Sequence, residues 1–208
     1  MSFPNDPHAC KRKQFINLVL KRVKPGTGSS LDFLNQRIWV HPVTNLNAIV
    51  QQAPFVVVGG IATRLYMPER MTLDLDILVL AEDAPSIYED LARSGGQRKG
   101  ELSIDRSQWQ LEDGTALDVT QSNANWAKEA IANPNYAADG LPIIALPYLV
   151  IMKLTASRTQ DLADVSRMLG NATDSELQEV RRAIEVYLPS ALEDLESLIS
   201  LGRLERDF

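Results

Sequence analysis

The sequence predicts an α/β protein of the α+β type, in which a small mixed sheet with flanking helices is followed by an α-helical C-terminal half. Two observations predict this class. Short apolar runs rich in β-branched residues, typical of buried strands, occur in the first part of the chain. From about residue 127 onward, apolar residues recur at the spacing near 3.6 that is typical of helices. Mixed elements followed by helices indicate an α/β half joined to a helical half.

The first half is expected to alternate between helices and strands. In chain order the sequence predicts a helix over residues 45–52, a strand over 55–58, a short helix over 61–66, a strand over 73–80, a helix over 85–93, and a hairpin of residues 107–111 with 116–120. Gly59-Gly60 ends the first strand, and Gly95-Gly96 ends the helix predicted over residues 85–93. Gly114 permits the positive φ that a tight hairpin turn needs.

The second half is predicted to contain four helices, over residues 147–157, 160–169, 175–188 and 191–204. Thr173-Asp174 and Pro189-Ser190 have the residue types that start helices. Ser157 and Gln160 have the spacing of a capping box, which predicts a break between the first two of these helices.

We therefore divide the chain into a basic N-terminal arm of residues 1–30, an α/β core of residues 31–125 and a helical region of residues 126–208. Residues 1–50 contain seven Lys and Arg against two Asp and Glu, whereas the rest of the chain contains 14 against 25. The arm can be interpreted as a contact for nucleic acid or an acidic partner, or as a solvated, flexible N-terminus. The acidic body is not the surface expected of a strong duplex-DNA binder.

Composition excludes several kinds of protein. No run of 18 apolar residues is present, so no membrane span is expected, and the apolar stretch near residue 16 is too short for a signal peptide. A single cysteine, Cys10, and two histidines provide neither an internal disulfide nor a zinc site. We therefore expect a cytoplasmic protein in which carboxylates, rather than a histidine base, carry the chemistry.

Asp74 and Asp76 are the main candidates for a metal site. They lie two residues apart in a predicted strand, so their side chains share one face of it. The two carboxylates, about 7 Å apart along the strand, would repel each other unless a cation lay between them. Oxygen ligands of this kind suit a hard divalent cation, Mg²⁺ or Mn²⁺.

Two further features accompany this pair. Gly59-Gly60 joins a strand to a helix, where backbone N–H groups can approach a phosphate without a Cβ in the way. Asp118 lies in an otherwise apolar strand, where an unpaired charge would be costly, and it is the natural third carboxylate. The same carboxylate could instead pair with Arg106 as part of the hairpin. A paired-glycine turn that leads into a metal-binding strand is typical of phosphoryl chemistry on a nucleoside triphosphate.

Gly59-Gly60, Asp74-x-Asp76 and the strand-borne Asp118 together resemble the polymerase β superfamily of nucleotidyltransferases. Residues 70–76 are also similar to the approach to the metal site in its AbiEii-like branch of abortive-infection toxins, and residues 149–169 are similar to the helical motif of that branch. The resemblance covers roughly residues 54–170. Many members have serine where this chain has Gly60, but the AbiEii-like branch often has glycine.

The resemblance implies an enzyme that transfers a nucleotide monophosphate from an NTP to a hydroxyl and releases pyrophosphate. In such an enzyme Asp74 and Asp76 would hold two metal ions, and Asp118 would bind the second and help to accept the hydroxyl proton. Lys153 would neutralise triphosphate charge, and Arg70 would bind phosphate or counter the two aspartates. The acceptor, on tRNA, protein or a small molecule, stays open, and a toxin-like role would imply a cognate antitoxin.

Blander interpretations of these residues also stay open. Asp-x-Asp occurs in surface strands, in sugar transferases, which do not need Gly59-Gly60 upstream, and in phosphatase-type folds, which usually have Thr or Val where this chain has Leu78. Lys153 with Asp161 and Asp164 could form ordinary ion pairs on a helix surface. As a second class of function, the fold could be a non-catalytic binding module, either an antitoxin or a regulatory partner.

Overall fold

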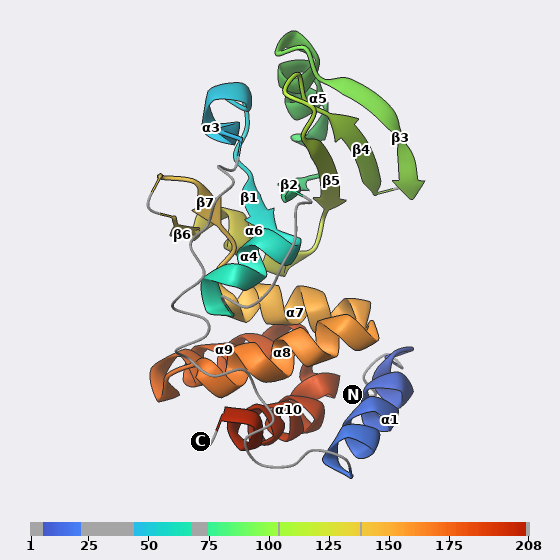
Figure 1. Ribbon diagram of the computed structural model, residues 1–208, viewed down its shortest axis with the longest axis vertical. Helices are drawn as coiled ribbons and strands as arrows, with labels where there is room; N and C mark the ends of the chain where they lie inside the picture. The colour runs from blue at the N-terminus through green and yellow to red at the C-terminus, as the bar shows by residue number, and fades with distance from the viewer. Residues whose placement is uncertain (1–5, 22–43, 68–74, 104, 138, 207–208) are drawn as a thin grey trace. The chain divides into compact units, whose positions relative to one another are not determined.

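The chain forms two compact units, one built on a sheet and one built on helices (Figure 1). The computed structural model describes residues 6–21, 44–67, 75–103, 105–137 and 139–206. The sheet unit consists of Ile38–Leu65 and Arg70–Ala145, and the helical unit of Met1–Arg37, Tyr66–Glu69 and Leu146–Phe208. The predicted class, a mixed sheet with flanking helices followed by a helical C-terminal part, is confirmed.

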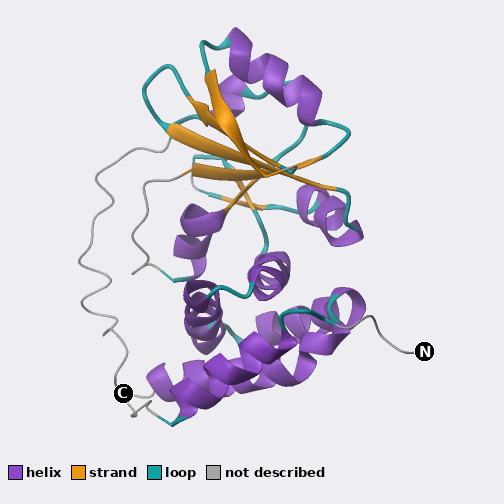
Figure 2. Cartoon of the chain, turned by 90° about the vertical axis from the view of Figure 1, so that its right-hand side faces the viewer, coloured by secondary structure: helices purple, strands orange, loops and turns teal. Residues whose placement is uncertain are grey.

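Over the described residues, the sheet has seven strands in the order β3-β4-β5-β2-β1-β7-β6 (Figure 1). Figure 2 shows the strands in orange. Its strands are β1 (Val56–Val58), β2 (Leu75–Leu80), β3 (Gln97–Ser103), β4 (Arg106–Gln110), β5 (Ala116–Ser122), β6 (Asn135–Tyr136) and β7 (Pro142–Ile143). Strand β2 runs parallel to β5 and β1 runs parallel to β7, whereas the other neighbours are antiparallel. The central strands carry the buried apolar side chains, as their β-branched composition predicts.

Four helices within the described ranges belong wholly or almost wholly to the sheet unit. They are α3 (Leu46–Ile49), α4 (Gly59–Tyr66), α5 (Ala84–Arg93) and α6 (Asn125–Ala132). Helix α5 buries Ile87 and Leu91, and α6 packs against β2. The buried Asp90 of α5 accepts hydrogen bonds from the backbone amides of Gln51 and Gln52, at 2.7 and 2.8 Å. These bonds fix the segment that leads into β1, and therefore the position of that strand.

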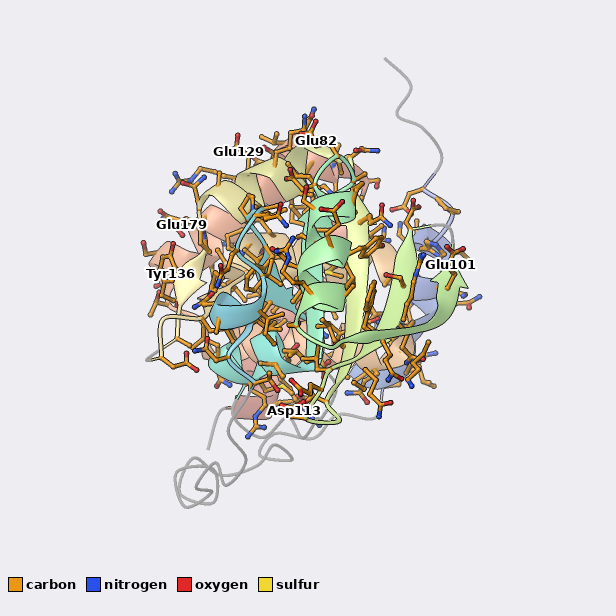
Figure 3. The ribbon with its side chains drawn as sticks, turned by 90° about the horizontal axis from the view of Figure 1, so that it is seen from above. Glu82, Glu101, Asp113, Glu129, Tyr136 and Glu179 are labelled. Atoms are coloured by element: carbon orange, nitrogen blue, oxygen red, sulfur yellow. The ribbon has the colours of Figure 1, made fainter. Side chains whose placement is uncertain are left out.

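Some sheet elements differ from the sequence prediction. Strand β3 is not predicted because it is an edge strand with the polar sequence of residues 97–103, which lacks apolar alternation. Strands β6 and β7 contain two residues each, too few to show a period, and they lie where the sequence predicts mainly helix. The exposed Tyr136 of β6 stands at the periphery in Figure 3. The helix predicted over 45–52 is shorter, and only α3 is helical there.

The helical unit contains α1 (Ala9–Leu20), α7 (Leu146–Ala156), α8 (Thr159–Asn171), α9 (Asp174–Tyr187), the 3-10 turn η1 (Pro189–Ala191) and α10 (Leu192–Arg206). Helix α10 packs along α8, and α7 packs against α8 and α9. The backbones of α8 and α10 meet directly, since a Cβ on Gly202 would lie 1.9 Å from the carbonyl oxygen of Ser166. The four predicted C-terminal helices are therefore present as one packed group.

The capping of these helices differs in one place from the prediction. The helix break near residue 157 is present, but the predicted capping box of Ser157 with Gln160 is wrong. Ser157 has φ 50° and donates its Oγ–H to the carbonyl of Leu154, so its side chain is not available to α8. A capping box is present instead at the start of α9, where Thr173 and Glu176 hydrogen-bond each other's backbone amides.

Part of the basic segment at the N-terminus is ordered helix. Arg12 of α1 is fully buried, and its Nε donates to Asp194 at 2.7 Å and its Nη1 to the carbonyl of Leu154 at 3.3 Å. Its Nη2 pairs with Asp6. Burial raises the pKa of the Asp6 carboxyl, but hydrogen bonds from Arg12, the His8 amide and Ser190 outweigh it and lower this pKa to about 2. No helix in the described ranges is both long and apolar enough for a membrane crossing.

Candidate functional site

The pairing of β2 with β5 brings two of the predicted acidic residues together. These strands run parallel, and Asp76 lies directly opposite Asp118 in the register. Opposite residues of neighbouring strands project from the same face of a sheet. Asp76 and Asp118 therefore form a carboxylate pair on one face of the central strands, flanked along each strand by buried apolar residues such as Ile77 and Val119.

Arg106 joins the two carboxylates. Its terminal nitrogen Nη2 donates to Asp76 Oδ1 at 3.0 Å and to Asp118 Oδ2 at 2.7 Å. The residue lies on β4, opposite Thr120, so its side chain reaches diagonally across β5 to arrive at β2. The three side chains, two carboxylates with one guanidinium, have a formal net charge of −1.

Gly59 closes one side of this group. Strand β1 is antiparallel to β2 with Val58 opposite Asp76, and Gly59 follows directly as the first residue of α4. Gly59 has φ 63°, and a Cβ at this position would lie 2.1 Å from Oδ2 of Asp76. Only glycine combines this φ with such a close approach. Gly60 is the second residue of α4, and Thr63 fixes the turn by donating its Oγ–H to the carbonyl of Gly59 at 2.8 Å.

The other predicted site residues are not brought into this group by the described part of the chain. Asp74 and Arg70 lie outside the described residues. Lys153 lies on α7 in the helical unit, where its Nζ donates to Asp161 Oδ1 at 3.2 Å and Asp164 Oδ2 at 2.8 Å. These ion pairs are buried, not exposed on a helix surface. The assignment of Lys153 to nucleotide binding stays a prediction.

The carboxylate pair suits a hard divalent cation by its chemistry. Because one nitrogen contacts both Oδ1 of Asp76 and Oδ2 of Asp118, these two oxygens are no further apart than the sum of the two contact distances. Carboxylate oxygens are the ligands that Mg²⁺ and Mn²⁺ prefer. Within the described ranges no group of three His, Cys, Asp or Glu side chains is close enough to hold a metal. A further ligand could come from Asp74, which lies outside the described residues, or from the substrate.

Sequence reasoning treats Arg106 only as an alternative partner for Asp118, and misses its contact with Asp76. The signal in the sequence is its place in the hairpin, two residues from Gln108, which lies opposite Asp118. Residues two apart in a strand share a face, so Arg106 and Asp118 are expected on the same side. The contact with Asp76 depends on a third strand, β2, whose pairing with β5 the sequence pattern does not reveal.

No protein-family model matches the chain. No curated protein sequence matches it either. Among solved structures, the chain is similar to ANT(2″)-Ia in complex with adenylyl-2″-tobramycin, with 20% identity over 74% of this chain and 88% of that one and a TM-score of 0.41. It is also similar to the Thermotoga maritima CCA-adding enzyme complexed with tRNA, with 16% identity over 81% and 49% of the two chains and a TM-score of 0.39. A third similar structure is the Megavirus polyadenylate synthase, with 9% identity over 100% of this chain and 39% of that one and a TM-score of 0.32. Likeness at this level carries no argument about activity, which has to be argued from the residues of the site.

Proposed function

We propose that the protein is a metal-dependent nucleotidyltransferase, which moves a nucleotide monophosphate from an NTP to a hydroxyl acceptor with release of pyrophosphate. The observation that carries the proposal is the carboxylate pair of Asp76 and Asp118 on adjacent parallel strands, with the backbone of Gly59 against Asp76. A pair of hard oxygen ligands beside a glycine turn suits a divalent cation together with a polyphosphate.

The roles of the residues follow from their chemistry. Asp76 and Asp118, with Asp74, would hold Mg²⁺ or Mn²⁺. When bound, the metal would polarise the phosphoryl group and neutralise charge on the pyrophosphate leaving group. Asp118 would accept the proton of the attacking hydroxyl as a general base. The backbone amides of Gly59 and Gly60 would face the phosphates.

The finer assignment rests on the resemblance of residues 70–76 and 149–169 to the AbiEii-like branch. On that assignment Arg70 and Lys153 would contribute positive charge towards the triphosphate. The protein would then be a cytoplasmic, toxin-like enzyme restrained by a cognate antitoxin. Its acceptor hydroxyl would belong to tRNA or to a protein.

A second candidate function is favoured by Arg106. Its guanidinium already supplies a cation to both carboxylates, which is what a non-catalytic binding module would need to keep them stable without metal. In that case the fold would serve as an antitoxin or regulatory partner, and the aspartates would have no metal to bind. The two functions therefore differ in whether metal binds at Asp76 and Asp118.

The test is transfer of label from NTPs that carry it on the α-phosphate. The protein would be incubated with each NTP, Mg²⁺, and RNA or protein extract, and both labelled products and released pyrophosphate would be measured. Matched variants are Asp118→Asn and Glu82→Gln, the latter an exposed carboxylate labelled in Figure 3. We expect label with the wild type and Glu82→Gln but not with Asp118→Asn. Absence of both transfer and metal binding in the wild type would favour the binding module.

A further inference from the structure

We propose that Arg106 is a built-in competitor of the metal, which occupies the place of a cation between Asp76 and Asp118 until metal and triphosphate bind together. The inference rests on the proposed function, because it concerns the same two carboxylates. It goes beyond that function by making metal binding depend on the displacement of a residue of the chain.

The geometry of the contact supports this competition. A single nitrogen, Nη2, makes both hydrogen bonds, so the positive group lies between the two carboxylates and does not pair with one of them side by side. A divalent cation that bridges the pair would take carboxylate oxygens at about 2.0–2.6 Å. Arg106 at its present position would then lie within a few ångströms of a doubly charged ion. Because like-charge repulsion grows as the distance falls, each of the two cations weakens the binding of the other to the pair in this arrangement.

Arg106 is also held in a way that permits release. Its side chain is partly exposed, and its buried Nε has no hydrogen-bond partner among the described residues. Arg12 of the helical unit is different, because its Nε, Nη1 and Nη2 all donate and the whole side chain is buried. Among the described residues, release of Arg106 breaks side-chain contacts of one terminal nitrogen, so its exchange for metal leaves the strands beneath it intact.

The triphosphate provides the released guanidinium with a new partner. A guanidinium binds phosphate oxygens through paired, charge-assisted hydrogen bonds, as it binds carboxylates. Metal alone must displace Arg106 into water, whereas metal with triphosphate transfers it from one set of anionic oxygens to another. By linkage, the two ligands then raise each other's affinity by the same factor. Arg106 thereby ties occupation of the metal site to the presence of the anionic substrate.

The experiment compares metal binding by the wild type, Arg106→Gln and Arg182→Gln. Arg182 is an exposed arginine on α9 and serves as the type-matched control. Calorimetric titration with Mg²⁺ or Mn²⁺ alone should show about tenfold tighter binding by Arg106→Gln than by the other two proteins, the factor that corresponds to about 1.4 kcal/mol. A non-hydrolysable NTP should raise the metal affinity of the wild type and the control more than that of Arg106→Gln.

Equal metal affinity in wild type and Arg106→Gln would overturn the inference. Weaker binding by the variant would also overturn it, because Arg106 would then position the carboxylates for metal. Should the variant fail to fold, the wild type alone decides through the ¹⁵N NMR signals of its arginine Nε groups. Saturation with Mg²⁺ should shift one of them, and no shift in any would be contrary to displacement. Absence of metal binding to every protein would overturn the proposed function as well, which distinguishes the two failures.

Discussion

The two units each contain a group of three charged side chains, one cation between two aspartates, but the groups differ in exposure. In the sheet unit Arg106, Asp76 and Asp118 have side chains that are 34%, 16% and 15% exposed. In the helical unit the corresponding values for Lys153, Asp161 and Asp164 are 7%, 7% and 1%. The same kind of ion pairing is thus partly open to water in one unit and closed to it in the other.

The degree of burial separates an ion-pair group that stabilises the fold from a candidate site. Around Lys153 the remaining carboxylate oxygens are also engaged, since Arg158 donates to Asp161 at 2.6 Å and Gln160 to Asp164 at 2.8 Å. Such a buried and fully bonded group joins α7 to α8, and loss of one member leaves a buried charge without compensation. Around Arg106 the same loss is partly compensated by water, so chemistry at that group can change with little effect on folding.

The largest expected effect is on the activity of an Asp76→Asn variant. Asparagine keeps the volume but removes one of the charges that would hold the metal, so transfer should fall by about a thousandfold or more. The free energy of unfolding without metal should stay within about 1 kcal/mol of the wild-type value, because the carboxylate is partly exposed and Asp118 still pairs with Arg106.

The measurement for this variant is a thermal melt with and without Mg²⁺ and a non-hydrolysable NTP, with Glu82→Gln as the matched control. The ligands should raise the melting temperature of the wild type and the control but not that of Asp76→Asn. An equal ligand-induced shift in all three proteins would mean that Asp76 binds no metal.

The same contrast in burial explains which parts of the fold can be predicted from the sequence. Strands β1, β2 and β5 are central, and their apolar composition reveals them, whereas the polar edge strand β3 has no such pattern. The helices from α7 to α10 are revealed by their 3.6-residue period because each buries one face. Helix α1 is not predicted, since its stability depends on buried ion pairs of Arg12 with residues distant in sequence.

The candidate site shows the same limit. The strand period indicates that Asp76 and Asp118 each project from one face of a strand, and the sequence alone suggests that they act together. Asp76 lies directly opposite Asp118 only because β2 pairs in parallel with β5. The two strands are separated by 35 residues along the chain, so no local sequence pattern reveals this pairing. The bridging by Arg106 needs the register of a third strand. Contacts that depend on two pairings at once cannot be read from spacing along the chain.

A Lys153→Met variant should lose more stability than any other variant proposed for this protein. Methionine matches the length of the lysine stem but removes the charge that pairs with both Asp161 and Asp164. Two buried carboxylates then face each other, and the free energy of unfolding should fall by about 3–5 kcal/mol. Urea unfolding measures this loss. The control Lys128→Met, at an exposed position of α6, should change stability by less than about 0.5 kcal/mol. Similar values for the two variants would remove the distinction between a buried and an open group.

A smaller effect is expected in acid from Asp6, the partner of Arg12. Its folded-state pKa of about 2 lies below the ordinary value of 3.8, so the unfolded chain binds more protons between these pH values. Its contribution to stability is therefore complete above about pH 5 and is lost as the pH falls through 2. At 1.36 kcal/mol per pKa unit the contribution is about 2 kcal/mol.

The test is urea unfolding of the wild type and Asp6→Asn at several pH values from 5 to 2. The difference between the two proteins should shrink by about 2 kcal/mol over this range. Asp90, whose pKa is also lowered in the folded protein, is present in both, so its contribution cancels in the difference. A difference that does not vary with pH would show that the ion pair with Arg12 does not persist in solution.

Two glycine variants test the group of Arg106, Asp76 and Asp118 most directly. Gly59 and Gly114 both have positive φ, 63° and 88°, so an alanine at either position should cost about 1–2 kcal/mol of stability through backbone strain. They differ in their surroundings. A Cβ at Gly114 meets nothing within 4 Å, whereas one at Gly59 would overlap both the carboxylate and the Cβ of Asp76. Because rotation of the carboxylate does not move the Cβ of Asp76, the backbone must shift as well. Urea unfolding should therefore give a larger loss for Gly59→Ala than for Gly114→Ala. The melting-temperature shift produced by Mg²⁺ and NTP should be reduced only in Gly59→Ala, because only there is a carboxylate of the site moved. A normal shift in a folded Gly59→Ala variant would mean that the contact between the glycine turn and Asp76 is not required for ligand binding, and the turn would then have only a structural role.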